Sequence, residues 1–393
     1  MNAARQGSLP WSAEHRAAAE QLVPSLAAAS PERLWAAVAL QAADRLEAAR
    51  RGIEAYRRHP YRRSVRDEPE IVWRQGSTRL RDFGGSGAPV LVVPSLVNRW
   101  FVLHLSERRS FLRLLKARGF RPLAVDWDAP GPAEREFGTA EYVAVRLEAV
   151  LDAVLARTGE APHLLGYCMG GNLTLALALR RQRDLRSLGL LATPWDFHAG
   201  RPAIAVLMGN ARKSIGGILD AYGEMPLDFL QSFFLALDPT LSDRKFRRFA
   251  AMPQDSDAAR DFVALEDWLN EGTALTKRTA EDCLFGWYGE NLTARRRWQV
   301  GGHAVDPRAL DLPSLAVVPG TDRIVPPESA RALAAEIPGC QVHVPPLGHI
   351  GMMVSNATES QLVEPVAAFL TAAKPRRPRS PRAIRAKRAA AAS

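Results

Sequence analysis

The sequence predicts an α/β protein whose mostly parallel, doubly wound sheet carries a helical cap insertion. Short apolar runs, bounded by proline, glycine or charged residues, alternate with helical patterns, which is typical of repeated βα units. The runs are apolar throughout, as expected of strands that are buried on both faces. The alternation stops near residue 199 and resumes near residue 301, and we assign this interval to the insertion.

A helical extension is predicted over residues 1–67. Residues 12–59 are rich in alanine, arginine and glutamate, and Leu46, Ala49, Ile53 and Tyr56 fall on one helical stripe. The helix is expected to end before Pro60, because proline disfavours a helical conformation in the residue that precedes it. The stripe fits either a surface for a partner or a second copy, or a helix packed against the body of the protein.

The main domain is predicted over residues 68–373. It begins with a hairpin, residues 71–73 and 78–80, which gives the sheet an antiparallel start. Further strands are expected at residues 90–93, 122–125, 163–167, 187–191, 314–318 and 341–344. Helices are expected at residues 111–118, 139–157, 173–179, 328–336 and 359–373.

The insertion, residues 199–301, is predicted to be helical and is rich in large aromatic side chains. Most of them individually fit a role in the insertion's own core. As a group they suggest an apolar enclosure that limits the access of water. The aromatic residues are Phe229, Phe233, Phe234, Phe246, Phe249, Phe262, Trp268, Phe285, Trp287 and Tyr288.

The net charge of +10 is concentrated in one segment. Eight basic residues and no acidic one lie between Lys374 and Arg388, so the rest of the 393-residue chain is nearly neutral, and no specific nucleic-acid partner is expected. Residues 374–393 have the proline, serine and arginine content of a disordered arm, which either contacts an acidic surface or only aids solubility. With 47% hydrophobic residues, the body can form a substantial core.

Several classes of protein are disfavoured. No apolar run approaches the roughly 18 to 20 residues of a transmembrane helix, and the first residues lack a signal-peptide pattern, so we expect a cytoplasmic protein. Three scattered cysteines, Cys168, Cys283 and Cys340, do not form a disulfide framework or a metal motif, and two of them are expected to be ordinary buried thiols. No GxGxxG or P-loop motif occurs, so we expect no nucleotide cofactor. The cysteine spacing likewise leads us to expect no metal.

The stretch His163-Leu-Leu-Gly-Tyr-Cys-Met-Gly-Gly-Asn172 predicts a strand, a sharp turn and a helix. Glycines lie two residues before and two residues after Cys168, as a strained nucleophile elbow requires. A lone cysteine after a strand can also be a small core residue, but the flanking glycines favour Cys168 as the nucleophile. This elbow indicates the α/β-hydrolase fold, with cysteine where serine is usual.

A base and an acid for this nucleophile are predicted further along the chain. The order Cys168, Asp322, His349 is the nucleophile, acid and base order of the α/β-hydrolase fold. His349 follows a predicted strand, whereas His343 lies within it. Asp126 and Asp128, which follow an earlier strand, compete with Asp322 for the role of the acid.

Attack by Cys168 on a carbonyl creates an oxyanion that needs two N–H donors. One should be the backbone of Met169, and the other should come from residues 94–98. An acyl group that moves from a thioester onto cysteine remains an activated thioester, whereas serine would trap it as an ordinary ester. Cysteine therefore favours acyl transfer to an alcohol, although hydrolysis by a cysteine enzyme of this fold stays open.

Several motifs together resemble those of the catalytic subunits of polyhydroxyalkanoate synthases. The resemblance covers about residues 68–370. It is carried, in order, by Val93-Pro-Ser-Leu-Val-Asn-Arg99, Gly166-Tyr-Cys-Met-Gly-Gly171, Leu265-Glu-Asp-Trp-Leu269, Gly301-Gly-His-Ala-Val-Asp306, Asp322-Arg-Ile-Val-Pro326 and Gly348-His-Ile350.

The resemblance implies that Cys168, activated by His349, takes a 3-hydroxyacyl group from its coenzyme A thioester. Asp322 would assist His349 or help to activate the incoming hydroxyl, and repeated transfer would lengthen a polyester. Val97 stands at the family's second oxyanion donor. The short chain is similar to the class III enzymes, so the resemblance also implies an accessory subunit, a homodimer and an association with polyester granules.

Four residues depart from the family pattern. Arg323 stands where a histidine is frequent after the acid, Trp100-Phe101 replaces a tyrosine pair, and His104 replaces an aspartate. We expect Arg323 to alter the coenzyme end of the site and the others to change cap packing. The alternatives are a hydrolase, either an intracellular polyester depolymerase or a thioesterase, and a non-catalytic granule-associated or regulatory binder.

Overall fold

A computed structural model describes residues 13–63, 68–237 and 240–375. The described chain divides into two compact units. The smaller unit takes its residues from the ranges 1–61 and 239–263, and the larger unit from 62–238 and 264–393. The sequence did not indicate that residues 239–263 pack with the N-terminal helices.

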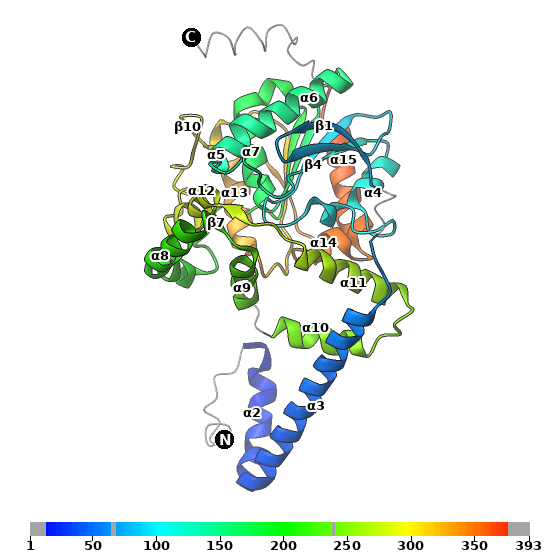
Figure 1. Ribbon diagram of the computed structural model, residues 1–393, viewed down its shortest axis with the longest axis vertical. Helices are drawn as coiled ribbons and strands as arrows, with labels where there is room; N and C mark the ends of the chain where they lie inside the picture. The colour runs from blue at the N-terminus through cyan, green and yellow to red at the C-terminus, as the bar shows by residue number, and fades with distance from the viewer. Residues whose placement is uncertain (1–12, 64–67, 238–239, 376–393) are drawn as a thin grey trace. The chain divides into compact units, whose positions relative to one another are not determined.

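An eight-stranded sheet forms the centre of the larger unit (Figure 1), in the order β1-β2-β4-β3-β5-β6-β11-β12. Strands β1 and β2 are antiparallel to each other, and β2 is antiparallel to β4, whereas every later pair is parallel. The predicted mostly parallel sheet with an antiparallel start is confirmed. The strands are Glu70–Gln75, Thr78–Asp82, Pro89–Val93, Arg121–Asp126, His163–Tyr167, Ser187–Leu191, Ser314–Val317 and Gln341–His343 for β1 to β6, β11 and β12.

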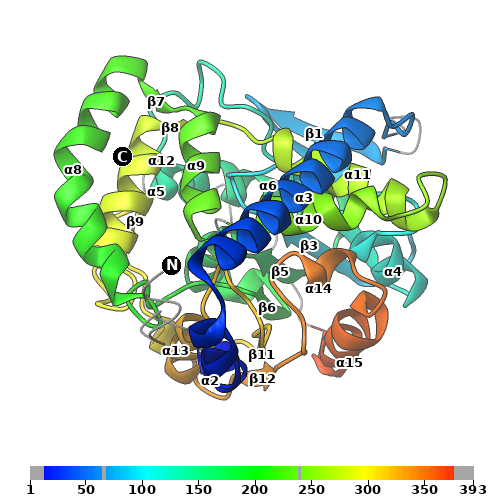
Figure 2. The same cartoon turned by 90° about the horizontal axis from the view of Figure 1, so that it is seen from below.

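Helices cover both faces of this sheet. Figures 1 and 2 show α4 and α15 side by side, and the Arg118 guanidinium just after α4 bonds Glu359 and Glu364. Helices α5, α6 and α7 lie on the other face (Figure 1). The helices that flank the sheet are α4 Phe111–Ala117, α5 Thr139–Glu141, η2 Tyr142–Leu147, α6 Glu148–Thr158, α7 Met169–Arg181, α13 Pro327–Glu336, α14 Gly351–Val354, η6 Glu359–Val363 and α15 Glu364–Ala372.

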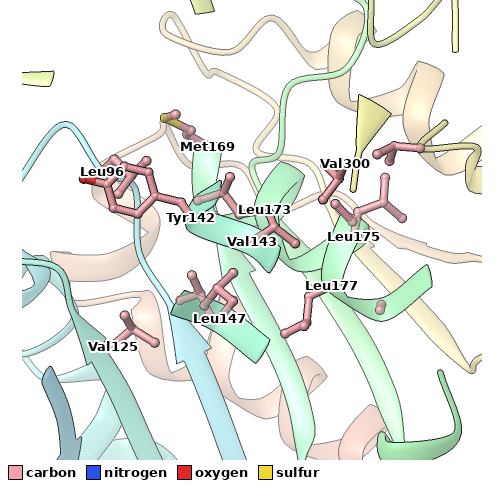
Figure 3. Close-up of a cluster of buried hydrophobic side chains, with 14 of the residues drawn as sticks. Leu96, Val125, Tyr142, Val143, Leu147, Met169, Leu173, Leu175, Leu177 and Val300 are labelled. Carbon is pink, nitrogen blue, oxygen red and sulfur yellow. The ribbon is translucent and has the colours of Figure 1, made fainter. Parts of the chain in front are cut away.

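Aliphatic side chains pack between α7 and η2. Figure 3 shows Leu173, Leu175 and Leu177 of α7 near Val143 and Leu147 of η2. All five side chains are fully buried. Because α7 begins directly after Cys168, this packing fixes the first turn of the helix that follows the predicted nucleophile.

The segment between β6 and β11 is mainly helical, with a short antiparallel pair of strands, β7 and β8. Its elements in the larger unit include α8 Pro202–Tyr222, β7 Glu224–Met225, α9 Leu227–Leu237, β8 Leu275–Thr276, α12 Lys277–Glu281 and η4 Asp282–Gly289. The hairpin of β9 Gln299–Val300 and β10 His303–Ala304 follows. Shorter 3-10 turns occur at η1 Trp100–Leu103, η3 Gln182–Asp184 and η5 Pro307–Ala309.

The aromatic residues of this segment do not form a single enclosure, contrary to our expectation. Phe249 and Phe262 stack with ring centroids 4.3 Å apart inside the smaller unit. Phe285 and Trp287 are instead buried in the main core of the larger unit, and Phe229 is 45% exposed. Phe285 and Trp287 therefore belong to the main core and not to a core of the insertion, and Phe249 and Phe262 belong to a core shared with the N-terminal helices.

The smaller unit is built on two helices, α2 Ala13–Ala28 and α3 Pro31–Arg58, and on α10 Leu241–Ala250 and the start of α11 Asp257–Asn270. The Ser30 side chain caps α3. At Gly52 a Cβ atom would lie 1.9 Å from the carbonyl oxygen of Phe246, so the two backbones touch. The predicted stripe is only partly buried, because Ala49 is 8% exposed but Leu46 is 72% exposed.

Two expectations lie wholly or largely outside the described residues. They are the structure of residues 1–12 and that of the basic arm beyond residue 375. In the part of the chain that is described, no helix is long and apolar enough to cross a membrane.

Candidate active site

Cys168 lies at the turn between β5 and α7. Its backbone has φ 56° and ψ −129°, a conformation that non-glycine residues rarely adopt and that must be held by the surroundings. The Cys168 N–H donates to the carbonyl of Leu191 on β6 at 2.8 Å, and its own carbonyl accepts from the Gly171 N–H at 2.8 Å. These bonds fix the strained turn that the motif predicts.

The glycines around Cys168 allow three close approaches. A Cβ at Gly166 would lie 2.2 Å from Thr174 Oγ1, and one at Gly171 would lie 1.8 Å from Thr193 Oγ1. A Cβ at Gly170 would meet the backbone carbonyl oxygens of Val93 and Pro94 at 2.2 and 2.6 Å. The last contact brings α7 against the loop after β3, where the second oxyanion donor is expected.

His349 and Asp322 form a hydrogen-bonded pair. The Nδ1 of His349 donates to Oδ2 of Asp322 at 2.6 Å, and both residues are 7% exposed. The other carboxylate oxygen, Oδ1, accepts from the N–H groups of Ile324 and Val325 at 2.8 and 2.9 Å. The carboxylate is therefore fixed by its own loop and holds the imidazole by a single ring nitrogen.

The Cys168 side chain completes the group through a hydrogen bond with His349. Burial lowers the pKa of His349, but the charge of Asp322 and that of Cys168 once it is a thiolate, together with the hydrogen bonds to both, outweigh this and raise the pKa of His349 to about 10. Since Nδ1 is engaged by Asp322, the second ring nitrogen is the one available to take a proton from the thiol. The structure thus brings together all three residues that were predicted from their order in the chain.

Tyr167 supports the base and was not predicted to do so. Its hydroxyl donates to the backbone carbonyl of His349 at 3.1 Å, and the centroids of the two rings lie 5.2 Å apart. Burial, with the nearby charges of Cys168 and Asp322, raises the pKa of Tyr167, so its hydroxyl keeps its proton. The residue just before the nucleophile therefore holds the loop of the base.

The two carboxylates considered as alternatives to Asp322 form ion pairs with arginine side chains. Asp126 accepts from Arg81 Nε at 2.9 Å, and Asp128 accepts from the guanidinium of Arg99 at 2.5 Å. Both lie close to Arg79 as well. These ion pairs account for both side chains without a role at His349.

The two predicted oxyanion donors lie in different settings. Met169 is the first residue of α7, where an amide has no acceptor within the helix. The N–H of Val97 instead donates to Ser95 Oγ at 3.2 Å. To serve as an oxyanion donor, the Val97 N–H must give up its bond to Ser95 Oγ. This exchange is favourable because an oxyanion is a stronger acceptor than a hydroxyl.

The loop after β3 is held by three hydrogen bonds that the sequence did not indicate. Trp127 Nε1 donates to the carbonyl of Pro94 at 3.1 Å, and Trp268 Nε1 donates to the carbonyl of Arg99 at 2.8 Å. The N–H of Thr273 donates to the carbonyl of Val97 at 3.1 Å. These indole and amide donors fix the backbone on either side of Val97.

The positions that depart from the family pattern have defined contacts. Arg323 is exposed, and its carbonyl accepts a hydrogen bond from the guanidinium of Arg201. Trp100 and His104 are both 4% exposed and both pack against Phe83. Phe83 is the residue just after β2, and the expectation that these two residues change the packing of the cap stays a prediction.

The other two cysteines are free thiols. Cys283 is buried and Cys340 is half-buried, and burial raises the pKa of both. Within the described ranges, no group of three or more His, Cys, Asp and Glu side chains is arranged to hold a metal ion.

Comparison with known proteins connects this site to a family. The family model of the alpha/beta hydrolase fold matches residues 88–355. The chain is 28% identical over 302 residues to the poly(3-hydroxyalkanoate) polymerase subunit PhaC of Haloferax mediterranei, covering 75% of this chain and 61% of that protein. It is 27% identical over 286 residues to the PhaC subunit of Allochromatium vinosum, covering 72% of this chain and 80% of that one.

A solved structure agrees on the fold. The Mycobacterium tuberculosis protein Rv0554 matches with a TM-score of 0.53 at 17% identity, over 76% of this chain and 94% of that chain. The matches to polymerase subunits agree with the resemblance that the motifs carry. The chain belongs to the α/β-hydrolase fold family, and poly(3-hydroxyalkanoate) polymerase subunits are among its relatives.

Proposed function

We propose that this protein is an acyltransferase that polymerises 3-hydroxyacyl groups into polyhydroxyalkanoate and releases coenzyme A. The observation that carries the proposal is a cysteine at the elbow, hydrogen-bonded to a histidine that is itself paired with an aspartate. The relatives named as poly(3-hydroxyalkanoate) polymerase subunits support the choice of substrate.

In the first half-reaction, His349 takes the proton of the Cys168 thiol and the sulfur attacks the thioester carbonyl carbon. The amide of Met169, with that of Val97 once it leaves Ser95, stabilises the oxyanion. The bond from carbon to the coenzyme A sulfur breaks, and the protonated His349 returns its proton to that sulfur. The products are free coenzyme A and an acyl group on Cys168.

In the second half-reaction, the 3-hydroxyl of another acyl unit attacks the thioester on Cys168. His349 takes the proton of this hydroxyl, an ester bond forms, and the Cys168 sulfur leaves and recovers the proton. Asp322 holds the imidazole in the tautomer that this cycle needs and stabilises its cation. The lengthened product has a hydroxyl group at one end and a thioester at the other. Either end can take part in the next transfer.

The proposal also covers the cofactors, partners, location and domain organisation of the protein. Coenzyme A is a substrate in this scheme, and neither a resident cofactor nor a metal is required. We propose a homodimer that works with an accessory subunit in the cytoplasm at the surface of polyester granules. We propose that the catalytic domain is residues 68–373. Its accompanying modules are the helical extension 1–67, the cap insertion 199–301 and the arm 374–393.

The test is to give purified full-length protein 3-hydroxybutyryl-coenzyme A, alone and with any accessory subunit encoded nearby. We expect free coenzyme A to be released in step with insoluble polymer. Monomeric 3-hydroxybutyrate as the only acyl product would overturn polymerisation in favour of a thioesterase. Release of soluble acid from added polyester, without polymer formation, would favour a depolymerase.

A further inference from the structure

The segment just after α11 lies against the loop after β3. A Cβ atom at Gly272 would lie 3.3 Å from Asn98 Oδ1 and 3.5 Å from the carbonyl oxygen of Val97, so the two segments are in close contact. The same loop touches the first turn of α7, because a Cβ at Gly170 would lie 2.6 Å from the carbonyl oxygen of Pro94. The loop is therefore in contact with both the nucleophile elbow and the insertion.

Thr273 bonds this loop through both its backbone and its side chain. Its N–H donates to the carbonyl of Val97, and its hydroxyl donates to the carbonyl of Leu96, each at 3.1 Å. Thr273 is only 8% exposed and Leu96 only 5%, so water has little access to the bond between them. One residue of the insertion thus holds two consecutive carbonyls of the loop.

The bond from the Thr273 hydroxyl acts on the amide that serves as the second oxyanion donor in the proposed function. The carbonyl of Leu96 and the N–H of Val97 belong to the same peptide group. Because a trans peptide group is planar, its carbonyl and its N–H point in opposite directions, and fixing one fixes the other. Donation to the carbonyl oxygen also polarises the peptide group and strengthens its N–H as a donor.

The Val97 N–H can change its partner without any movement of its peptide group. It donates to Ser95 Oγ at 3.2 Å, and a serine hydroxyl can rotate away. The carbonyl of the same peptide group stays bonded to Thr273 in the meantime. An oxyanion that replaces Ser95 Oγ would meet a donor whose direction is already set, so the loop need not reorganise.

We propose that Thr273 is a positioning residue of the oxyanion hole. Its hydroxyl, through the Leu96 carbonyl, directs the Val97 N–H toward the oxyanion that forms when Cys168 attacks the thioester. The inference rests on the proposed acyl transfer at Cys168. The oxyanion develops only after the substrate has bound, so the Thr273 hydroxyl should affect the rate of acylation and not the affinity for the acyl donor.

Replacing Thr273 by valine tests the inference, because valine keeps the branched shape of the side chain but lacks the hydroxyl. The experiment measures acylation of Cys168 by 3-hydroxybutyryl-coenzyme A in single turnovers of the full chain, by intact-mass spectrometry and coenzyme A release. We expect the maximal acylation rate to fall by about 10- to 100-fold, since one oxyanion donor is misdirected. The substrate concentration that gives half of this rate should stay nearly unchanged.

Two matched variants separate this role from a structural one. Thr273→Ser keeps the hydroxyl and should acylate at nearly the wild-type rate. Thr279→Val also removes a buried hydroxyl of the insertion, one that donates to the carbonyl of Phe137 at 3.1 Å, and it should leave the acylation rate unchanged. Urea unfolding measures the loss of stability, which we expect in both valine variants. If Thr273→Val does not fold, Thr273→Ala removes the same hydroxyl and should show the same loss of rate.

Four outcomes would overturn the inference. They are an unchanged acylation rate in Thr273→Val, an equal loss of rate in Thr273→Ser, an equal loss of rate in Thr279→Val, and a change in the half-maximal substrate concentration alone. A wild type whose Cys168 is not acylated would instead overturn the proposed function itself, and this inference with it.

Discussion

Nδ1 of His349 donates to Oδ2 of Asp322 at 2.6 Å, and the second oxygen of that carboxylate is occupied by two backbone N–H groups. The imidazole is thus oriented by a carboxylate that cannot turn away from it. The remaining ring nitrogen faces the Cys168 side chain. The His349 ring is therefore held in the orientation that the proposed base needs before any substrate binds.

Replacing Asp322 by asparagine tests this orientation. An amide can present its NH₂ group to Nδ1, which favours the wrong tautomer of His349, and the variant also loses a charge that raises the pKa of His349. We expect the turnover rate with 3-hydroxybutyryl-coenzyme A to fall by about 10³- to 10⁴-fold. Asp128→Asn is the matched control, because Asp128 pairs with Arg99, and its rate should stay within about threefold. Equal losses in the two variants would contradict the assignment of the acid.

Replacing Cys168 by alanine removes the proposed nucleophile with little change in volume. Coenzyme A release should fall to the level without enzyme, and the melting temperature should stay close to that of the wild type. Cys168→Ser should at most form an acyl-serine that turns over slowly, because an oxygen ester is less activated than a thioester. Full function in Cys168→Ala would instead indicate a non-catalytic binder.

Gly170 and Gly217 form a matched pair of glycines for a stability test. Gly170→Ala places a methyl group 2.2 Å from a backbone carbonyl, so we expect a loss of about 3 kcal/mol and disturbance of the loop after β3. Gly217, exposed on α8, has no atom within 4 Å of its would-be Cβ, so Gly217→Ala should stabilise the protein by up to about 1 kcal/mol. Urea unfolding of both variants measures the difference. A Gly170→Ala variant as stable as the wild type would contradict the close approach.

We expect the buried His163 to lower the free energy of unfolding in acid. It is buried on β5, 2.8 Å from Ser187 Oγ, and burial, helped by Arg186, lowers its pKa to about 4. Above pH 6.5 the folded and unfolded states are both neutral at this residue. As the pH falls from 6.5 to 4, only the unfolded state takes up the proton, so the free energy of unfolding declines by about 3 kcal/mol.

The measurement is urea unfolding of the wild type and of His163→Asn at several pH values. The asparagine can still bond Ser187 but cannot titrate. We therefore expect the stability difference between the two proteins to be constant above pH 6.5 and to shift in favour of the variant below it. Parallel curves down to pH 4 would show that His163 does not cause the loss.

The central sheet was predictable because its strands are buried on both faces and carry their own local signal. The predicted strand at residues 163–167 has the same bounds as β5, and the predicted antiparallel hairpin is β1 and β2. The grouping of Cys168, Asp322 and His349 was predictable for a related reason. In this fold the site residues follow strands in a fixed order, so their order in the chain is itself information.

Features that depend on contacts between distant segments were not predictable. Neither helical periodicity nor composition shows that Gly52 of α3 touches the backbone of Phe246, which divides the aromatic residues of the insertion between two units. The indoles of Trp127 and Trp268 have no local pattern that indicates their bonds to the loop after β3. The same holds for Tyr288, whose ring contacts come from residues 55 and 91 positions earlier in the chain.

The bond from the Cys168 N–H to the Leu191 carbonyl continues the ladder between β5 and β6 one residue beyond the end of β5. Cys168 is thus the last hydrogen-bonded residue of the β5–β6 pair. Central strands belong to the part of a protein that undergoes local unfolding least often. In the proposed reaction, each acyl group is therefore bound at the end of a central pair of strands. Movements of the surrounding helices would leave the position of the sulfur unchanged from one transfer to the next.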